Sequence, residues 1–158
     1  MIDKIGIKTT LRDLVAYKVL NPGENEVAAC AKFSGELYKL GAKPGDPNMV
    51  LFYDPKDDPG CRREIMIPIE KEVEGIDTKK MPEMKVAFIV FIGTDQPVEY
   101  YYEKLYEFIE QQGLKPSTQM CSIEAVFQPD EFNLSYGSFI DEDNPEHWRT
   151  EIMIPVEE

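Results

Sequence analysis

The octapeptide Arg-Glu-Ile-Met-Ile-Pro-Ile-Glu at residues 63–70 returns as Thr-Glu-Ile-Met-Ile-Pro-Val-Glu at residues 150–157, with six identities in eight positions and an offset of 151 − 64 = 87. A repeat of this kind decides whether a chain builds one core or two similar ones. We therefore expect two related modules, each of which closes with this segment.

Both copies alternate between β-branched residues and other side chains, which is typical of a strand with one core-facing side. The other side carries a carboxylate, Glu64 in the first copy and Glu151 in the second. The simplest interpretation is that these glutamates are exposed and pair across strands with Arg63, Arg149 or lysines, which contributes less than about 1 kcal/mol. The shared proline predicts an edge strand or a strand end.

Length and composition narrow the class of protein. The chain has 158 residues, enough for one domain or for two modules that share a core. Its 30 acidic and 17 basic residues give a net charge of −13, which argues against a nucleic-acid partner. Three separated cysteines and one histidine form no metal-ligand set, and no cofactor motif is present. Without a signal peptide or membrane-spanning segment, we expect a cytoplasmic protein that does not bind membranes.

The first half of the chain has the pattern β-α-β-β. Apolar runs bounded by turn residues predict strands, and apolar residues at three- and four-residue steps that end at Gly41 predict a helix. The elements expected here are a strand over 11–20, a helix over 24–40, a strand over 49–53, a hairpin loop over 54–60 and the first copy of the repeated strand.

The second half repeats that pattern after a charged segment at residues 71–83, which we interpret as a linker. We expect a strand over 85–93, a helix over 98–112 that ends at Gly113 with Asp95 as its cap, a strand over 122–130 and the second copy of the repeated strand. The offset between matching residues is 74 at Pro55 and Pro129 but 87 in the repeated strand, which places an insertion at residues 131–144. An alternative alignment makes residues 138–141 the strand and places the insertion earlier.

Two such modules predict a pseudo-symmetric α+β fold with an antiparallel sheet and both helices on one face. We expect one domain over residues 1–158, with module one at about 5–70, the linker at about 71–83 and module two at about 84–158. The other sheet face, or the seam between the modules, is left for something else to cover.

No strong catalytic motif is present, and a surface position is expected for His147. Glu124 interrupts an otherwise apolar strand, so it either faces solvent by alternation or is buried for a reason. Aromatic residues lie on or beside the predicted strands. Rings around a carboxylate would suit a lipophilic cation, although most of these rings are expected in the core.

The paired modules, the strand ends Tyr53-Asp54-Pro55 and Phe127-Gln128-Pro129, and the repeated closing strand resemble the GyrI-like domain, the effector-binding domain also found in BmrR and some AraC-type regulators. The resemblance runs from about Ile5 to the end of the chain. It implies a cleft between the modules that binds hydrophobic, often cationic aromatic compounds, with a buried glutamate at its base.

The resemblance also implies the residues of that cleft. The glutamate corresponds to Glu124, and the expected ligand-binding aromatic residues are Tyr17, Tyr53, Phe88, Tyr136 and Trp148. No helix-turn-helix precedes residue 1, so binding to DNA in the manner of the related regulators is not expected. The loop at residues 131–144 could cap the cleft or block it.

Three functions follow as alternatives. The favoured one is a stand-alone protein that binds lipophilic or cationic small molecules. The second is a hydrolase of reactive cyclopropane-bearing toxins, in which Glu124 acts as the general base and Tyr136 or another tyrosine orients water. The third is a GyrI-type module that acts on a protein partner.

Overall fold

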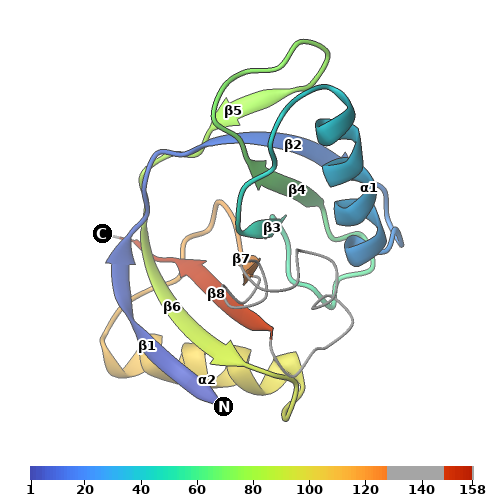
Figure 1. The fold of residues 1–158 in the computed structure, drawn as a ribbon. Coiled ribbons are helices and arrows are strands. Elements are labelled where there is room, and N and C mark those ends of the chain that lie inside the picture. The colour runs from blue at the N-terminus through green and yellow to red at the C-terminus, as the bar shows by residue number, and fades with distance from the viewer. Residues whose placement is uncertain (128–147, 158) are drawn as a thin grey trace.

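The computed structural model describes residues 1–127 and 148–157, which form one antiparallel sheet and two helices (Figure 1). The helices are α1 (Glu26–Lys39) and α2 (Val98–Gln111). The strands are β1 (Ile2–Thr9), β2 (Leu14–Leu20), β3 (Asn48–Phe52), β4 (Arg63–Pro68), β5 (Thr78–Lys80), β6 (Lys85–Ile92), β7 (Ser122–Phe127) and β8 (Arg149–Pro155). Neither described helix is long and apolar enough to cross a membrane.

The order of the strands confirms the pseudo-symmetric α+β fold. The order is β1-β6-β8-β7-β3-β4-β2-β5, so β3 and β7 pair at the centre. Outward from this pair, β4, β2 and β5 on one side correspond to β8, β6 and β1 on the other. The sheet curls, with β2, β4 and β5 at the top of Figure 1 and β1, β6 and β8 below them. The two modules therefore share one continuous sheet.

Both helices cover the same face of the sheet. Val50, Glu124 and Ile152 form one row across β3, β7 and β8. Val50 packs in the cluster under α1, and Ile152 packs in the cluster under α2. Because residues in one row point to the same side, the row places α1 and α2 on a common face.

The ends of the helices have local causes. The side chain of Asn25 accepts a hydrogen bond of 2.9 Å from the N–H of Ala28, which caps α1. Gly41 and Gly113 follow the two helices with φ of +81° and +69°, a conformation that favours glycine, as predicted. Asp95 was expected to cap α2, but Pro97 occupies the cap position, and Asp95 instead accepts hydrogen bonds from the Met1 amino group and Tyr101.

The prolines of the repeated strand lie at strand ends, as predicted, because Pro68 and Pro155 are the last residues of β4 and β8. Both strands are internal to the sheet, where a proline earlier in the strand would remove a ladder hydrogen bond. Two strands were missed. β1 lies in the charged start of the chain, and β5 lies in the segment interpreted as a linker. The insertion at 131–144 and its alternative strand at 138–141 lie outside the described residues.

Candidate functional site

The sheet face that carries no helix has its own hydrophobic cluster, which joins the two modules. Strand alternation turns Glu64 and Met66 of β4 to this face, opposite Ile65 and Ile67 under α1. Its buried members come from both halves of the chain: Val15, Met49, Leu51, Met66, Met81, Val86, Phe88, Val90, Ile123, Ala125 and Met153. This helix-free face is the surface on which the modules meet.

Methionines are concentrated on the helix-free face. Met49, Met66, Met81 and Met153 are buried in its cluster, and Met84 and Met120 pack against it, which accounts for six of the seven methionines in the sequence. Methionine is unbranched and polarisable, and it adapts to partners of different shape. A cluster with this composition can adapt its packing to neighbours of different shape.

Two rows of side chains cross the helix-free face in mirrored order. One row runs Glu64, Leu51, Ile123, Met153 and Phe88. The row beside it runs Tyr17, Met66, Met49, Ala125 and Glu151. Each row therefore has a carboxylate from one module near one end and an aromatic ring from the other module at the other end, with apolar side chains between them.

Glu64 is buried, and its carboxylate interacts with Lys79 and Tyr53. The Lys79 ammonium of β5 forms an ion pair with Oε1, and the Tyr53 hydroxyl donates a hydrogen bond of 3.2 Å to Oε2. The same ammonium lies 4.5 Å from the centre of the Tyr17 ring. Burial and then the Glu64 carboxylate raise the pKa of Tyr53, so its hydroxyl keeps the proton that it donates.

Glu151 has a matching environment in the second module. Lys8 of β1 lies 2.5 Å from its Oε2, and the Lys8 ammonium lies 4.6 Å from the centre of the Phe88 ring. Gly6 of β1 pairs with Phe88, and a Cβ at this glycine would lie 3.3 Å from the ring, so the missing side chain lets the ring approach the strand. Both modules thus combine a glutamate, a lysine from an outermost strand and an aromatic ring.

These observations overturn the interpretation of Glu64 and Glu151 as exposed. Their exposed fractions are 4% and 5%, although alternation alone would leave this face to solvent. Their environments are duplicated, as the sequence repeat indicates. The signal that could have identified them is the pairing of each repeated glutamate with a repeated Val-Ala-aromatic segment, at Tyr17 and Phe88, on the same face.

Glu124 lies on the opposite face, between the two helix-covered clusters. The Tyr102 hydroxyl of α2 donates a hydrogen bond of 2.5 Å to Glu124 Oε2, and the Lys56 ammonium lies 2.7 Å from the same oxygen. Ser122 lies 2.9 Å from the Tyr102 hydroxyl. Burial and then Glu124 raise the pKa of Tyr102 well above its usual value. The structure therefore does not bring Glu124 together with Tyr17, Tyr53 or Phe88, which belong to the opposite face, and the predicted role of Glu124 in ligand binding stays a prediction.

The predicted aromatic residues have different positions. Phe88 is buried in the cluster of the helix-free face, and Tyr17 and Tyr53 pack against that cluster. Trp148 precedes β8, and its carbonyl oxygen accepts a hydrogen bond of 2.9 Å from the N–H of Gly93. Tyr136 lies outside the described residues. Three of the predicted residues thus share the helix-free face with Glu64 and Glu151.

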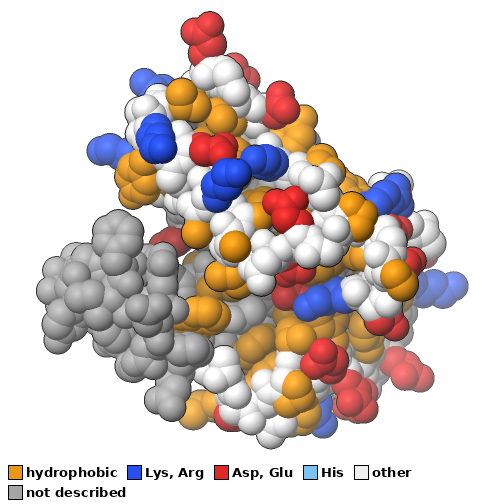
Figure 2. Space-filling view, turned by 90° about the vertical axis from the view of Figure 1, so that its right-hand side faces the viewer, with side chains coloured by type: hydrophobic (Ala, Val, Ile, Leu, Met, Phe, Trp, Pro, Cys, Tyr) orange, Lys and Arg blue, Asp and Glu red, His pale blue; other side chains and the backbone are white. Residues whose placement is uncertain are grey.

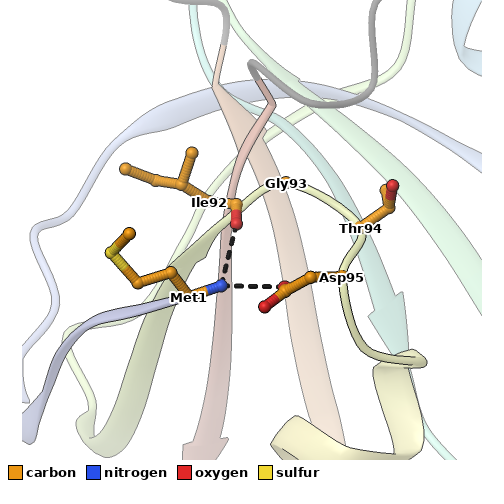
Figure 3. Close-up of a pocket in the computed structure, with 5 residues that line it drawn as sticks. All are labelled: Met1, Ile92, Gly93, Thr94 and Asp95. Carbon is orange, nitrogen blue, oxygen red and sulfur yellow. Dashed lines mark hydrogen bonds and ion pairs between the residues drawn. The ribbon is translucent and has the colours of Figure 1, made fainter.

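A cavity of about 460 Å³ lies elsewhere, near the start of the chain (Figure 3). It is lined by Met1, Ile92, Gly93, Thr94 and Asp95. The Met1 amino group lies within it, 3.1 Å from the Ile92 carbonyl oxygen and 2.8 Å from Asp95 Oδ1. None of the glutamates or aromatic residues described above lines this cavity, so it contributes nothing to the candidate site.

Charged side chains on the surface are intermixed. On the side shown in Figure 2, acidic and basic side chains alternate, with hydrophobic side chains between them. The excess of acidic residues does not gather into a single patch on this side. The overall net charge of −13 is therefore a weaker guide to a binding site than the two buried glutamates.

Solved structures with the same fold include three informative ones, all below 25% identity. The EcmrR C-terminal domain is 14% identical with a TM-score of 0.76, and the match covers 98% of each chain. SAV2435 bound to tetraphenylphosphonium is 16% identical with a TM-score of 0.54, covering 98% of this chain and 94% of that one. A hydrolase from Listeria innocua, encoded by lin2189, is 11% identical with a TM-score of 0.53, covering 96% and 91%.

The EcmrR chain in a complex with DNA also matches, but this chain spans only 57% of its length. A comparison with curated proteins found no match. The model of the GyrI-like small molecule binding domain matches residues 22–157, which is most of the chain. With the duplicated modules and the shared fold, this match identifies the chain as a member of the GyrI-like small-molecule-binding domain family.

Proposed function

We propose that the protein binds hydrophobic cations on the helix-free face, with Glu64 and Glu151 supplying the negative charge. The observation that carries this proposal is the presence of two buried carboxylates beside a methionine-rich cluster, each paired with a lysine whose ammonium lies over an aromatic ring. A lipophilic cation needs an apolar surface for its body, and a ring face with a counter-charge for its charge. The duplicated environments provide all three.

The proposal replaces Glu124 with Glu64 and Glu151 as the acidic groups of the site. Glu124 is already held by Tyr102 and Lys56 beneath the helices, whereas the other two glutamates lie among the residues expected to contact a ligand. The related fold of SAV2435, solved with tetraphenylphosphonium, supports a cationic aromatic ligand. That compound is therefore a suitable probe.

A titration with two ions of the same shape tests the proposal. Tetraphenylphosphonium and tetraphenylborate differ in the sign of their charge, so the wild type should bind the cation more tightly. Glu64→Gln or Glu151→Gln should weaken binding of the cation about 10- to 100-fold, because a charged interaction worth about 1.5–3 kcal/mol is lost. Calorimetry measures both affinities.

Glu124→Gln is the matched control, since it removes a partly buried carboxylate from the other face of the sheet. It should leave the affinity for tetraphenylphosphonium unchanged. If binding were lost in Glu124→Gln alone, the acidic group of the site would instead be Glu124, as the family resemblance implies. Equal affinity of the wild type for the two ions would contradict a cation site of any location.

Hydrolysis of cyclopropane-bearing toxins is a second candidate, favoured by the Tyr53–Glu64 hydrogen bond of 3.2 Å. A carboxylate that accepts a proton from water, next to a tyrosine that positions the water, would serve as a general base. Lys79 occupies the other oxygen of Glu64, so this chemistry requires the lysine to move. Ring opening of a cyclopropane electrophile that is abolished in Glu64→Gln and kept in Glu124→Gln would support this function.

A further inference from the structure

The two lysines of the helix-free face occupy the positions that the charge of a ligand would take. The Lys79 and Lys8 ammonium groups each contact a buried carboxylate and lie 4.5 Å and 4.6 Å from the centres of the Tyr17 and Phe88 rings. An ammonium against a ring face and a carboxylate is the arrangement by which proteins bind organic cations. Each half of the protein thus holds a cation of its own.

The lysine is the partner that can leave. The side chains of Lys8 and Lys79 are 40% and 33% exposed, whereas those of Glu151 and Glu64 are both 6% exposed. Both lysines extend from the outermost strands of the described sheet, and β5 has three residues, which pair with β2. A long, flexible and strongly hydrated ammonium side chain can turn to water without disturbing the core, which a buried glutamate cannot.

We propose that Lys8 and Lys79 are built-in competitors, which neutralise Glu151 and Glu64 in the empty protein and are displaced into water when a cationic ligand binds. This inference rests on the proposed function, because it concerns cations at the same face. It makes the two lysines determinants of specificity: a small hydrophilic ammonium ion gains nothing over the lysine that it replaces. Only a cation with a large apolar body adds contacts with the methionines, and so the displacement selects lipophilic cations.

Lysine substitutions test the competition directly. Lys8→Met or Lys79→Met should tighten binding of tetraphenylphosphonium by about tenfold or more, because the ligand then meets an unpaired buried carboxylate. The same substitutions should weaken binding of tetraphenylborate, which a lysine attracts. Lys104→Met is the matched control, since Lys104 lies 5.4 Å from the Tyr100 ring and 3.8 Å from Glu107 on the exposed surface of α2, and it should change neither affinity.

Chemical labelling of the wild type gives a second measurement that needs no substitution. Saturation with tetraphenylphosphonium should speed reductive methylation of Lys8, Lys79 or both by several-fold, because the released amine enters water. The rate at Lys104 should stay the same. Mass spectrometry of the peptides that contain these residues gives each rate, and the lysine that responds identifies the half of the protein that holds the ligand.

The outcomes separate the two proposals. If the wild type binds the cation but the lysine substitutions leave its affinity unchanged or weaken it, and labelling is unaffected, the competition is overturned and the proposed function stands. If neither the wild type nor a lysine variant binds the cation, the proposed function itself is overturned, and the competition with it.

Discussion

Lys79→Met is expected to lower the free energy of unfolding by about 3 kcal/mol, because it leaves the buried carboxylate of Glu64 without its cation. Removing one member of a buried ion pair costs about 3–5 kcal/mol, and the lower value applies here because a third of the Lys79 side chain is exposed and Tyr53 still donates to the glutamate. Urea unfolding at neutral pH, followed by circular dichroism, measures the change.

A second substitution at Glu64 should restore much of that loss. In Lys79→Met combined with Glu64→Gln, no unpaired buried charge remains at this position, and the new amide can still accept the Tyr53 hydrogen bond. Lys104→Met, which breaks an exposed pair, should change stability by less than about 0.5 kcal/mol. If the double variant were as unstable as Lys79→Met, the lost lysine contacts, and not the unpaired carboxylate, would explain the effect.

Ile152→Ala is expected to destabilise the fold by about 2–5 kcal/mol, and Ile65→Ala by a similar amount. Both isoleucines are fully buried at equivalent positions of the repeated strand, Ile65 under α1 and Ile152 under α2. Each substitution leaves a cavity that the packed helix cannot fill without moving. The equivalence of the two environments predicts costs of similar size, which urea unfolding of the two variants can compare.

The double variant tests whether the modules unfold together. Ile65 and Ile152 are separated by β3 and β7, or about 14 Å at the usual strand spacing, so their effects should add within about 0.5 kcal/mol. Because β3 and β7 pair within one sheet, a single unfolding transition is expected for every variant. Two separate transitions in Ile152→Ala, with the first module surviving, would show instead that each module has a stable core of its own.

Local signals in the sequence were sufficient for most of the fold. The repeated strand with its terminal proline, the helix-ending Gly41 and Gly113 and the period-two apolar runs identified both β-α-β-β modules and the common face of the helices. These signals work because they arise from backbone conformation and from the alternation of neighbouring residues. β1 and β5 were not predicted, because no element was assigned before residue 11 and the charged residues 71–83 were interpreted as a linker. These two strands are established by their pairing with β6 and β2.

The candidate site was predicted less completely. Tyr17, Tyr53 and Phe88, which the family resemblance implied as ligand-binding residues, share the helix-free face, but Glu124 faces the helices and is held by Tyr102. Alternation shows that Glu64 and Glu151 point away from the isoleucines of their strands. Alternation does not show whether that side of the sheet is exposed to solvent or buried. This difference decides whether a glutamate is an ordinary surface residue or a buried charge.

The sequence by itself therefore determined the duplicated modules and the two helices with the glycines that end them, because these depend on residues close together in the chain. Only the tertiary structure decided that both glutamates of the helix-free face are buried. It also brought Lys8 to Glu151 and Lys79 to Glu64, across 143 and 15 residues. Such pairings depend on the order and curvature of the strands, which no local pattern encodes.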